Sequence, residues 1–333
     1  MFWQKKKNEA PQYSGVTPAL VKLCYQLILN REPESQEVID DKAAHARDFE
    51  SLLRSFVESP EFKDKLATLT ALHDLSGSRQ RQIDVDVDSA VLDRLFLRTQ
   101  DQWEKLGQKE PFWSVITHDI YRAEKLDESA RKKFYDTGRE SADLIECFES
   151  RTGVPANRGT CIELGSGTGR VTRWLATKFD RVLALDISPG NLKVCEDMAR
   201  ALGLANIECR LVNGFDVFKG LGEYDFFFST IVLMHNPPPV QRFILDEMLA
   251  RLRVGGEFLF QLQTHDFDLQ SRDNWYQFDA EAYLESPAET MDMHVLPMRY
   301  VFELLSKHGL KPKEVLMDTW TGHIGSHTFF GTK

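Results

Sequence analysis

The sequence has few of the features that mark exported, membrane-spanning or metal-binding chains. No apolar run approaches the roughly 18 residues of a membrane span, and no apolar segment follows the basic start MFWQKKKNEA, so we expect neither a span nor a leader. The cysteines form no C-x-x-C pair and are odd in number, which favours reduced thiols in a cytoplasmic protein. They are Cys24, Cys147, Cys161, Cys195 and Cys209.

An excess of basic residues is also missing. The chain has 41 Lys and Arg against 51 Asp and Glu, a formal net charge of −10. Nucleic acid is held largely by neutralising phosphates with basic side chains, so this balance argues against a nucleic-acid partner. We expect a small or neutral substrate instead.

The 333 residues, 42% of them hydrophobic, suffice for one large and one small domain. Apolar spacings of three and four predict helices from Pro18 onward, over 35–46, over 48–66, and from 90 to Gly107. Two further helices are predicted before Gly153, broken near Gly138. We expect a helical module at 1–75, a linker and helical extension at 76–130, and a third domain at 131–333.

After residue 159, apolar runs alternate with helical patterns. The runs lie at 160–164, 181–187, 207–213, 224–230 and 257–263, and the helical patterns at 170–178, 189–202 and 238–252. Strands this apolar predict a parallel sheet covered on both faces, in a doubly wound α/β fold. The last two runs, 313–320 and 327–333, lie so close together that only an antiparallel connection can join them.

The stretch TCIELGSGTGRVTRWLA, residues 160–176, places three glycines between a predicted strand and a helix. Gly165, Gly167 and Gly169 let the backbone turn tightly and approach a ligand at a helix N-terminus. A P-loop needs Lys followed by Ser or Thr after its last glycine, but Arg170 and Val171 stand there. The dinucleotide motif G-x-G-x-x-G fails as well, because Arg170 replaces its third glycine.

The segment IELGSGTG resembles the cofactor loop of class I S-adenosylmethionine-dependent methyltransferases, and the resemblance covers about residues 130–333. It implies a seven-stranded, mostly parallel sheet with the last strand antiparallel, and S-adenosyl-L-methionine as cofactor. The glycines would line the methionine and ribose part of the cofactor, and Glu163 would support its amino end. Asp186, 17 positions after Gly169, would accept the ribose hydroxyls; the alternative is a helix cap.

The other cofactor contacts that the resemblance implies match the usual positions of the family less closely. Asp216 falls a residue or two beyond the usual acidic position near adenine, so Phe215 could lie against the ring instead. Tyr135 and Gly138 would cover the methionine end, unless they only pack helices. The expected cofactor-binding residues are Glu163, Gly165, Ser166, Gly167, Gly169, Asp186, Ile187, Phe215, Asp216, Thr230, Tyr135 and Gly138.

Methyl transfer needs alignment above all, but a hydroxyl or ammonium acceptor must also lose a proton to a base. By resemblance, Thr230, Leu233 and His235 lie beside the sulfonium and the acceptor pocket. The candidate bases are His235, His265 and His294, each of which could instead be a surface or packing residue. His323 and His327 would not converge if one lies in a turn and the other on a strand, and no carboxylate cluster accompanies them, so we expect no metal site.

Two segments bear on the acceptor. The polar stretch 261–296 is long enough to be functional and reads as a substrate lid, with Trp275 and Tyr276 as platforms for a ring. The front end resembles a short helical domain found beside bacterial glycosyl- and methyltransferases, although any small helical appendage is an alternative. The matching positions are Tyr25, Leu29, Arg31, Pro33, Ser59, Pro60, Glu61 and Phe62.

These resemblances imply a bacterial enzyme that methylates a sugar hydroxyl of a surface polysaccharide or its precursor, with a protein partner at the helical module. One alternative is an O- or N-methyltransferase of a small secondary metabolite. Another is a scaffold that binds the cofactor without catalysis.

Overall fold

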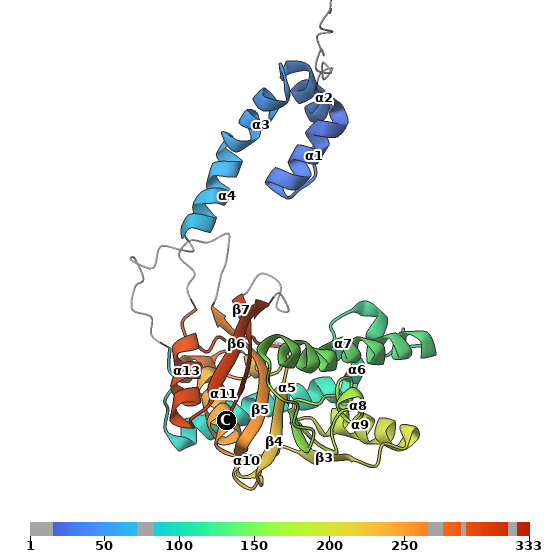
Figure 1. Cartoon of the computed structure of the whole chain (residues 1–333), viewed down its shortest axis with the longest axis vertical. Helices are drawn as coiled ribbons and strands as arrows, with labels where there is room; N and C mark the ends of the chain where they lie inside the picture. The colour runs from blue at the N-terminus through green and yellow to red at the C-terminus, as the bar shows by residue number, and fades with distance from the viewer. Residues whose placement is uncertain (1–15, 72–82, 266–275, 288–290, 319–324) are drawn as a thin grey trace, which may run out of the picture. The chain divides into compact units, whose positions relative to one another are not determined.

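The computed structural model describes residues 16–71, 83–265, 276–287, 291–318 and 325–333 (Figure 1). The chain divides into two compact units, Met1–Gln80 and Arg81–Lys333. Trp275 and His323, named above as a ring platform and a possible metal ligand, lie outside the described residues.

The first unit is helical. Thr17 caps α1 by accepting the Leu20 N–H, as its Thr-Pro start predicts. The single helix predicted over 48–66 is instead two helices, because Pro60 lacks an N–H and begins a new one, capped by the Ser59 hydroxyl. The helices are α1 (Pro18–Leu29), α2 (Gln36–His45), α3 (Phe49–Val57) and α4 (Pro60–Ala71).

Arg31 joins the helices of this unit. Its guanidinium donates to both carboxylate oxygens of Glu61, at 2.8 and 2.7 Å, and to Glu34 at 2.8 Å. It also lies 4.9 Å from the centre of the Tyr25 ring, whose edge packs on Phe56. Its hydrogen bonds hold the pKa of Glu61 at about 2. Within the first unit, Tyr25, Arg31 and Glu61 therefore stabilise the packing of the helices.

The second unit is built on a seven-stranded sheet with the order β3-β2-β1-β4-β5-β7-β6 (Figure 1). The first five strands in this order are parallel, and β7 runs antiparallel to both of its neighbours. The predicted doubly wound α/β fold with an antiparallel last strand is confirmed. The strands are β1 (Thr160–Leu164), β2 (Arg181–Asp186), β3 (Ile207–Leu211), β4 (Tyr224–Ser229), β5 (Leu252–His265), β6 (Lys311–Asp318) and β7 (Gly325–Thr332).

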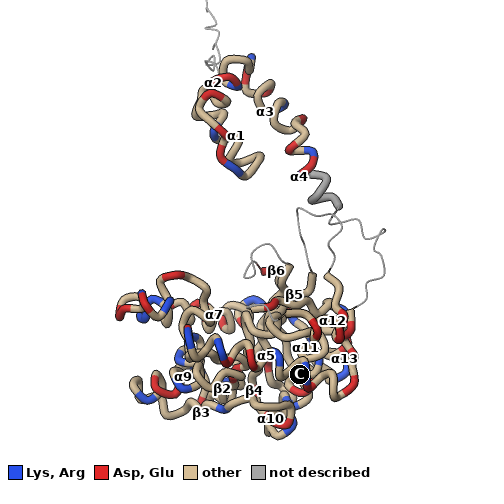
Figure 2. Tube along the Cα trace, turned by 180° about the vertical axis from the view of Figure 1, so that it is seen from behind, with Lys and Arg blue, Asp and Glu red and all other residues tan. Residues whose placement is uncertain are grey.

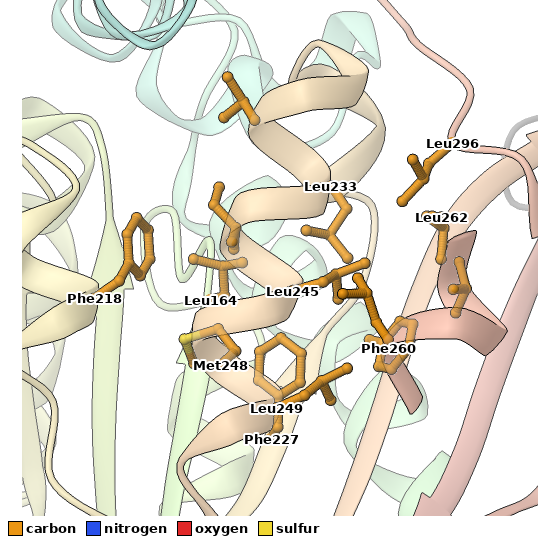
Figure 3. Packing of buried hydrophobic residues seen from close by; sticks show 14 of the residues in the cluster. Leu164, Phe218, Phe227, Leu233, Leu245, Met248, Leu249, Phe260, Leu262 and Leu296 are labelled. Atoms are coloured by element: carbon orange, nitrogen blue, oxygen red, sulfur yellow. The ribbon is translucent and has the colours of Figure 1, made fainter. Parts of the chain in front are cut away.

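Helices cover both faces of the sheet, and the strands supply apolar side chains to each face alternately. On β4, Phe227 faces the core that includes α11, whereas Phe226 and Phe228 face the core that includes α7. Figure 3 shows α11 residues Leu245 and Met248 packed near Phe227. The helices are α5 (Ser89–Lys109), α6 (Pro111–Val115), α7 (Glu128–Thr152), α8 (Thr172–Leu175), α9 (Pro189–Leu202), α10 (Asp216–Lys219), α11 (Pro238–Ala250), α12 (Ala280–Glu285) and α13 (Met298–Lys307), with 3-10 turns η2 (Asp119–Tyr121) and η3 (Leu233–His235).

Basic and acidic residues are interspersed along the chain in both units (Figure 2). Many are paired four residues apart on one helix, as Lys132 and Asp136 are on α7 and Lys193 and Asp197 on α9. Each exposed pair of this kind stabilises its helix by about 0.3–0.5 kcal/mol. None of the helices in the described ranges combines the length and the apolar character that crossing a bilayer requires.

Helix α7 is one unbroken helix, although the sequence predicts a break near Gly138. It ends, as predicted, at Gly153, whose φ of 69° is left-handed. Gly138 makes room for the glycine loop, since a Cβ atom there would lie 1.9 Å from the carbonyl oxygen of Arg170. Packing of α7 against the loop thus offsets the roughly 1 kcal/mol by which glycine weakens a helix.

We expect Gly138→Ala to destabilise the protein by about 1–3 kcal/mol, the usual effect of overpacking, even though alanine is the better helix former. The clash is with backbone, which cannot move without moving the loop. Thermal unfolding would measure the change, with Lys133→Ala at an exposed position of the same helix as control. Equal stability of the Gly138 variant and the wild type would show that the loop can shift.

Candidate functional site

A cavity of about 510 Å³ lies at the carboxyl ends of β1, β2 and β4. The strand order reverses between β1 and β4, and in doubly wound sheets this is the point at which ligands bind. Its walls come from the glycine loop after β1, the residues after β2 and β4, helix α5, and Ser114–Thr117 at the end of α6 and just beyond it. The sheet thus brings together segments that are far apart in the sequence.

The glycine loop is tied to β2 by backbone hydrogen bonds. The N–H groups of Gly165 and Ser166 both donate to the Leu185 carbonyl, at 2.7 and 3.0 Å. Gly165 and Gly167 have φ values of 76° and 54°, which disfavour other residues. A Cβ atom at Gly165 would also lie 2.2 Å from the Val232 side chain. Both glycines therefore let the loop turn tightly and the neighbouring backbone approach closely.

Asp186 lies in the cavity wall at the end of β2. Its carboxylate accepts the N–H of Gly167 at 2.7 Å and that of Ser188 at 2.8 Å, so it links the glycine loop to the start of α9. The helix cap considered for Asp186 is supplied by Ser188, whose hydroxyl accepts from Asn191. Burial raises the pKa of Asp186 to about 6, although the backbone N–H groups lower it.

Glu163 is a second buried carboxylate in the same wall, only 3% exposed. Burial raises its pKa to about 7, while the Thr172 hydroxyl and the Arg170 guanidinium lower it. Its Oε2 has no hydrogen-bond partner. A buried carboxylate oxygen without a partner is costly unless a ligand pairs with it, so this position suits a cationic group.

Arg170 also lines the cavity. In the sequence it served only to exclude a P-loop and a dinucleotide-binding loop. It is buried, its Nε has no partner, and its NH1 makes long contacts of 3.5 and 3.4 Å to the hydroxyls of Thr137 and Ser141. Burial lowers the pKa of Arg170 and the Glu163 carboxylate raises it. The cavity therefore holds a cation beside the unpaired carboxylate.

His235 lies in η3, after β4, and lines the cavity. Its Nδ1 lies 3.0 Å from the main-chain carbonyl of Asp292. A carbonyl can only accept, so Nδ1 carries the proton and Nε2 is left unprotonated. Burial lowers the pKa of His235, which keeps the imidazole neutral at pH 7. The edge of its ring meets Trp103, with centroids 4.9 Å apart.

Backbone strain marks the same cavity. Ile231 and Met291, both in its wall, have φ values of 59° and 60°. For a β-branched residue such as Ile231 this is an outlier that costs about 1–3 kcal/mol, and such strain clusters at functional sites. The Ile231 N–H donates to Gln261, whose amide in turn donates to Ser326 on β7, so the sheet holds the strained residue in place.

The predicted cofactor residues divide into two groups. Those in the cavity wall are Glu163, Gly165, Ser166, Gly167, Asp186, Ile187 and Thr230. Tyr135 and Gly138 instead pack behind the glycine loop, where the Tyr135 hydroxyl donates to the Thr168 carbonyl at 3.2 Å. Gly169 faces α9, because a Cβ atom there would lie 2.5 Å from Met198. These three residues shape the loop from outside the cavity.

Phe215, Asp216 and Leu233 also differ from their predicted places. Phe215 is buried between Phe96 and Phe243, at centroid distances of 4.8 and 4.4 Å. Asp216 begins α10 with its side chain 97% exposed. Leu233 points into the hydrophobic core beneath η3 (Figure 3). A residue that directly follows a strand can be assigned from sequence to one end of the sheet. The sequence does not show whether its side chain points into the cavity.

Two of the three candidate bases lie away from the described cavity wall. His265, at the end of β5, has its Nδ1 2.7 Å from the Thr264 hydroxyl. His294 is buried, with its Nδ1 2.8 Å from the Tyr276 hydroxyl, and burial lowers its pKa to about 4. Tyr276, predicted as a ring platform, thus supports His294 instead.

Helix α5 supplies the wall residues that sequence reasoning missed. Phe96, Thr99 and Trp103 recur at helical spacing and line the cavity from one face of the helix. That spacing was visible in the sequence, but it does not say which partner the face contacts. Met291 and Met293, from the segment after α12, complete the wall near His235.

Residues 161–256 match the model of a family described as a methyltransferase domain. A phosphoethanolamine N-methyltransferase from Triticum aestivum is 26% identical over 159 residues, covering 47% of this chain and 30% of that protein. Methyltransferase AacuQ from Aspergillus aculeatus is 31% identical over 100 residues, covering 30% of this chain and 31% of that protein. The chain thus spans less than a third of the length of either relative.

Among solved structures, the magnesium protoporphyrin IX methyltransferase from Synechocystis PCC 6803 with bound SAH has a TM-score of 0.48 and 14% identity. The match covers 69% of this chain and 97% of that one. The family match runs from β1 into β5, so it includes the glycine loop, Asp186 and the loop that carries His235. Helix α5 lies outside it.

Proposed function

Because the chain contains a class I S-adenosylmethionine-dependent methyltransferase domain, we propose that it methylates a hydroxyl of an uncharged, ring-bearing acceptor. The acceptor we favour is a sugar of a bacterial surface polysaccharide or its precursor. One observation carries the proposal: a single cavity has an unpaired carboxylate at its glycine-loop end and a neutral histidine in its wall. The free thiols of all five cysteines fit a cytoplasmic enzyme.

The cavity residues fit the proposed cofactor group by group. Glu163 would pair with the ammonium of its amino-acid end, and Arg170 with the carboxylate. Asp186 would accept the ribose hydroxyls, since each carboxylate oxygen can accept more than one bond. Apolar wall residues, Ile187 and Phe218 among them, would enclose the adenine. When bound, S-adenosylmethionine supplies a methyl group on an electrophilic sulfonium.

The acceptor class follows from the charges in the wall. Among the described residues that line the cavity, the ionised groups are Glu163, Asp186 and Arg170, all assigned above to the cofactor. Near His235 the wall is formed by Trp103 and the two methionines, which suit the flat face of a ring. An acceptor such as phosphoethanolamine, named for a relative, would need a cation for its phosphate. The relatives' names nevertheless favour a small-molecule acceptor as the second candidate.

The proposed reaction places two demands on the chain. The cavity must hold the acceptor in line with the methyl group, which can lower the barrier by roughly 7–11 kcal/mol. His235 must also take the hydroxyl proton on Nε2, an effect worth about 10²–10⁴ in rate. Its neutral state at pH 7 and its Nδ1–H bond to the Asp292 carbonyl support this role.

We expect His235→Gln to lower turnover by about 100-fold or more while the affinity for S-adenosylhomocysteine stays unchanged. Glutamine keeps a polar side chain of similar reach but cannot accept the proton. Transfer of labelled methyl to glycan extracts, methyl glycosides, phenols and phosphoethanolamine would identify the acceptor class, with His265→Gln as control. Full turnover by the His235 variant would remove it as base, and preference for phosphoethanolamine would contradict the uncharged acceptor.

We assign a recruiting role to the helical unit, which has its own core around Tyr25 and Phe56. Deletion of residues 1–80 is therefore expected to leave S-adenosylhomocysteine binding within about twofold of the full chain. Isothermal titration of both proteins would measure this. Loss of binding in the shorter protein would instead make the unit part of the cofactor site.

A further inference from the structure

The segment that follows α12 is hydrogen-bonded to the loop that carries His235. The N–H of His294 donates to the Met234 carbonyl at 2.7 Å, and His235 Nδ1 donates to the Asp292 carbonyl at 3.0 Å. Gln241 joins the same two segments, since its amide donates to the carbonyls of Asn236 and His294, at 2.7 and 3.2 Å. The place of the Asp292 carbonyl therefore sets the orientation of the His235 ring.

The side chain of Asp292 is held by two different helices. Its Oδ2 accepts the hydroxyl of Tyr283, on α12, at 2.6 Å and the amide of Gln102, on α5, at 3.0 Å. The Arg98 guanidinium covers the Tyr283 ring at 4.1 Å and donates to the Ser286 and Pro287 carbonyls. The Tyr283 donor is thus itself fixed in place.

The backbone around Asp292 needs such support. Met291, directly before it, has the left-handed φ of 60°, and both Met291 and Met293 line the cavity. The carboxylate between them is bound by α5 and α12 instead. A strained conformation persists only where surrounding contacts over-determine it, and these two hydrogen bonds are such contacts.

We infer that Asp292 is a positioning residue: its carboxylate, bound by Tyr283 and Gln102, fixes the main-chain carbonyl that holds His235 with Nδ1 protonated. The catalytic part of this inference rests on the proposed role of His235 as base. The part that concerns the orientation of His235 does not rest on that role, because the protonation of each ring nitrogen can be observed without a methyl acceptor. A residue that only stabilised the fold would leave that protonation unchanged.

The test is the nitrogen NMR spectrum of the full chain labelled at histidine, with the His235 signals assigned by their loss in His235→Gln. The wild type is expected to show His235 protonated at Nδ1 alone. Asp292→Ala should give a mixture of the two tautomers and lower turnover about tenfold or more, with affinity for S-adenosylhomocysteine within twofold. Asp292→Asn should largely restore both, since its amide oxygen can still accept from Tyr283 and Gln102.

A second variant, Tyr283→Phe, keeps the ring beneath Arg98 and removes one hydrogen bond to Asp292. It tests the same inference if Asp292→Ala does not fold. A partial shift toward the second tautomer is expected there. An Nδ1-protonated His235 that is unchanged in both Asp292→Ala and Tyr283→Phe would overturn the inference. Failure of the wild type to bind S-adenosylhomocysteine would instead overturn the proposed function, and the NMR result would still decide how His235 is oriented.

Discussion

Asp186→Ala is expected to weaken the binding of S-adenosylhomocysteine by about 10- to 100-fold. The variant loses the carboxylate proposed to accept the ribose hydroxyls, and one hydrogen bond to a charged group contributes roughly 1.5–3 kcal/mol. It also frees the Gly167 N–H, which Asp186 accepts at 2.7 Å, so part of the loss comes through the glycine loop. Isothermal titration would measure the affinity.

Asp216→Ala is the matched control for this experiment. Asp216 is also an acid near the end of a strand, and the sequence placed it near the adenine, but its side chain is exposed. We expect its removal to leave the affinity unchanged. An Asp186→Ala protein that keeps wild-type stability and binds with wild-type affinity would rule out the ribose assignment. A loss of affinity in Asp216→Ala would restore its predicted place near the adenine.

The affinity for S-adenosylhomocysteine is also expected to fall about tenfold as the pH is lowered from 8 to 6. Burial raises the pKa of Glu163 to about 7 in the folded protein, and only its ionised form can pair with the cofactor's ammonium. Binding is therefore strongest above pH 7 and weakens as Glu163 takes up a proton. Asp186, with a pKa of about 6, adds a loss of the same sign at lower pH.

Titration in buffers of different ionisation enthalpy would count the proton released on binding near pH 7. Glu163→Gln should bind more weakly at pH 8 and show a much flatter pH profile. The stability of the unliganded protein should change in the opposite sense: the folded-state pKa of Glu163 lies above its unfolded value, so this group favours the folded state increasingly as the pH falls from about 7 toward 4.5. An affinity that is flat from pH 8 to 6 in the wild type would contradict the role of Glu163.

The parts of this protein that sequence could predict are those decided locally. The sequence predicts a strand at 160–164, between Gly159 and Gly165, and β1 spans the same residues, Thr160–Leu164. The glycine loop, Asp186 and His235 all follow predicted strands, and parallel strands bring their carboxyl ends to one edge. The helix predicted over 170–178 is only Thr172–Leu175, because turns take up the rest of the segment.

What sequence could not predict depends on contacts between distant segments. A glycine can make room for a ligand or for a helix. Gly138 lets α7 pack against the glycine loop, and Gly169 lets the loop pack against α9. Trp103 and Met291 line the cavity from segments nearly 190 residues apart, which no local pattern relates. Their placement follows from how α5 packs against the rest of the unit.

The position of α5 in the chain has a consequence for how such an enzyme can change its substrate. The groups proposed to hold the cofactor lie within residues 161–256, whereas Trp103 is on a helix that precedes this stretch. Exchanging Phe96, Thr99 and Trp103 would therefore reshape the proposed acceptor pocket without replacing His235 or any residue proposed to hold the cofactor. On the proposed assignments, acceptor choice and methyl transfer would be encoded in different parts of this chain, which makes the Trp103 face of α5 the natural target for redirecting it to a new acceptor.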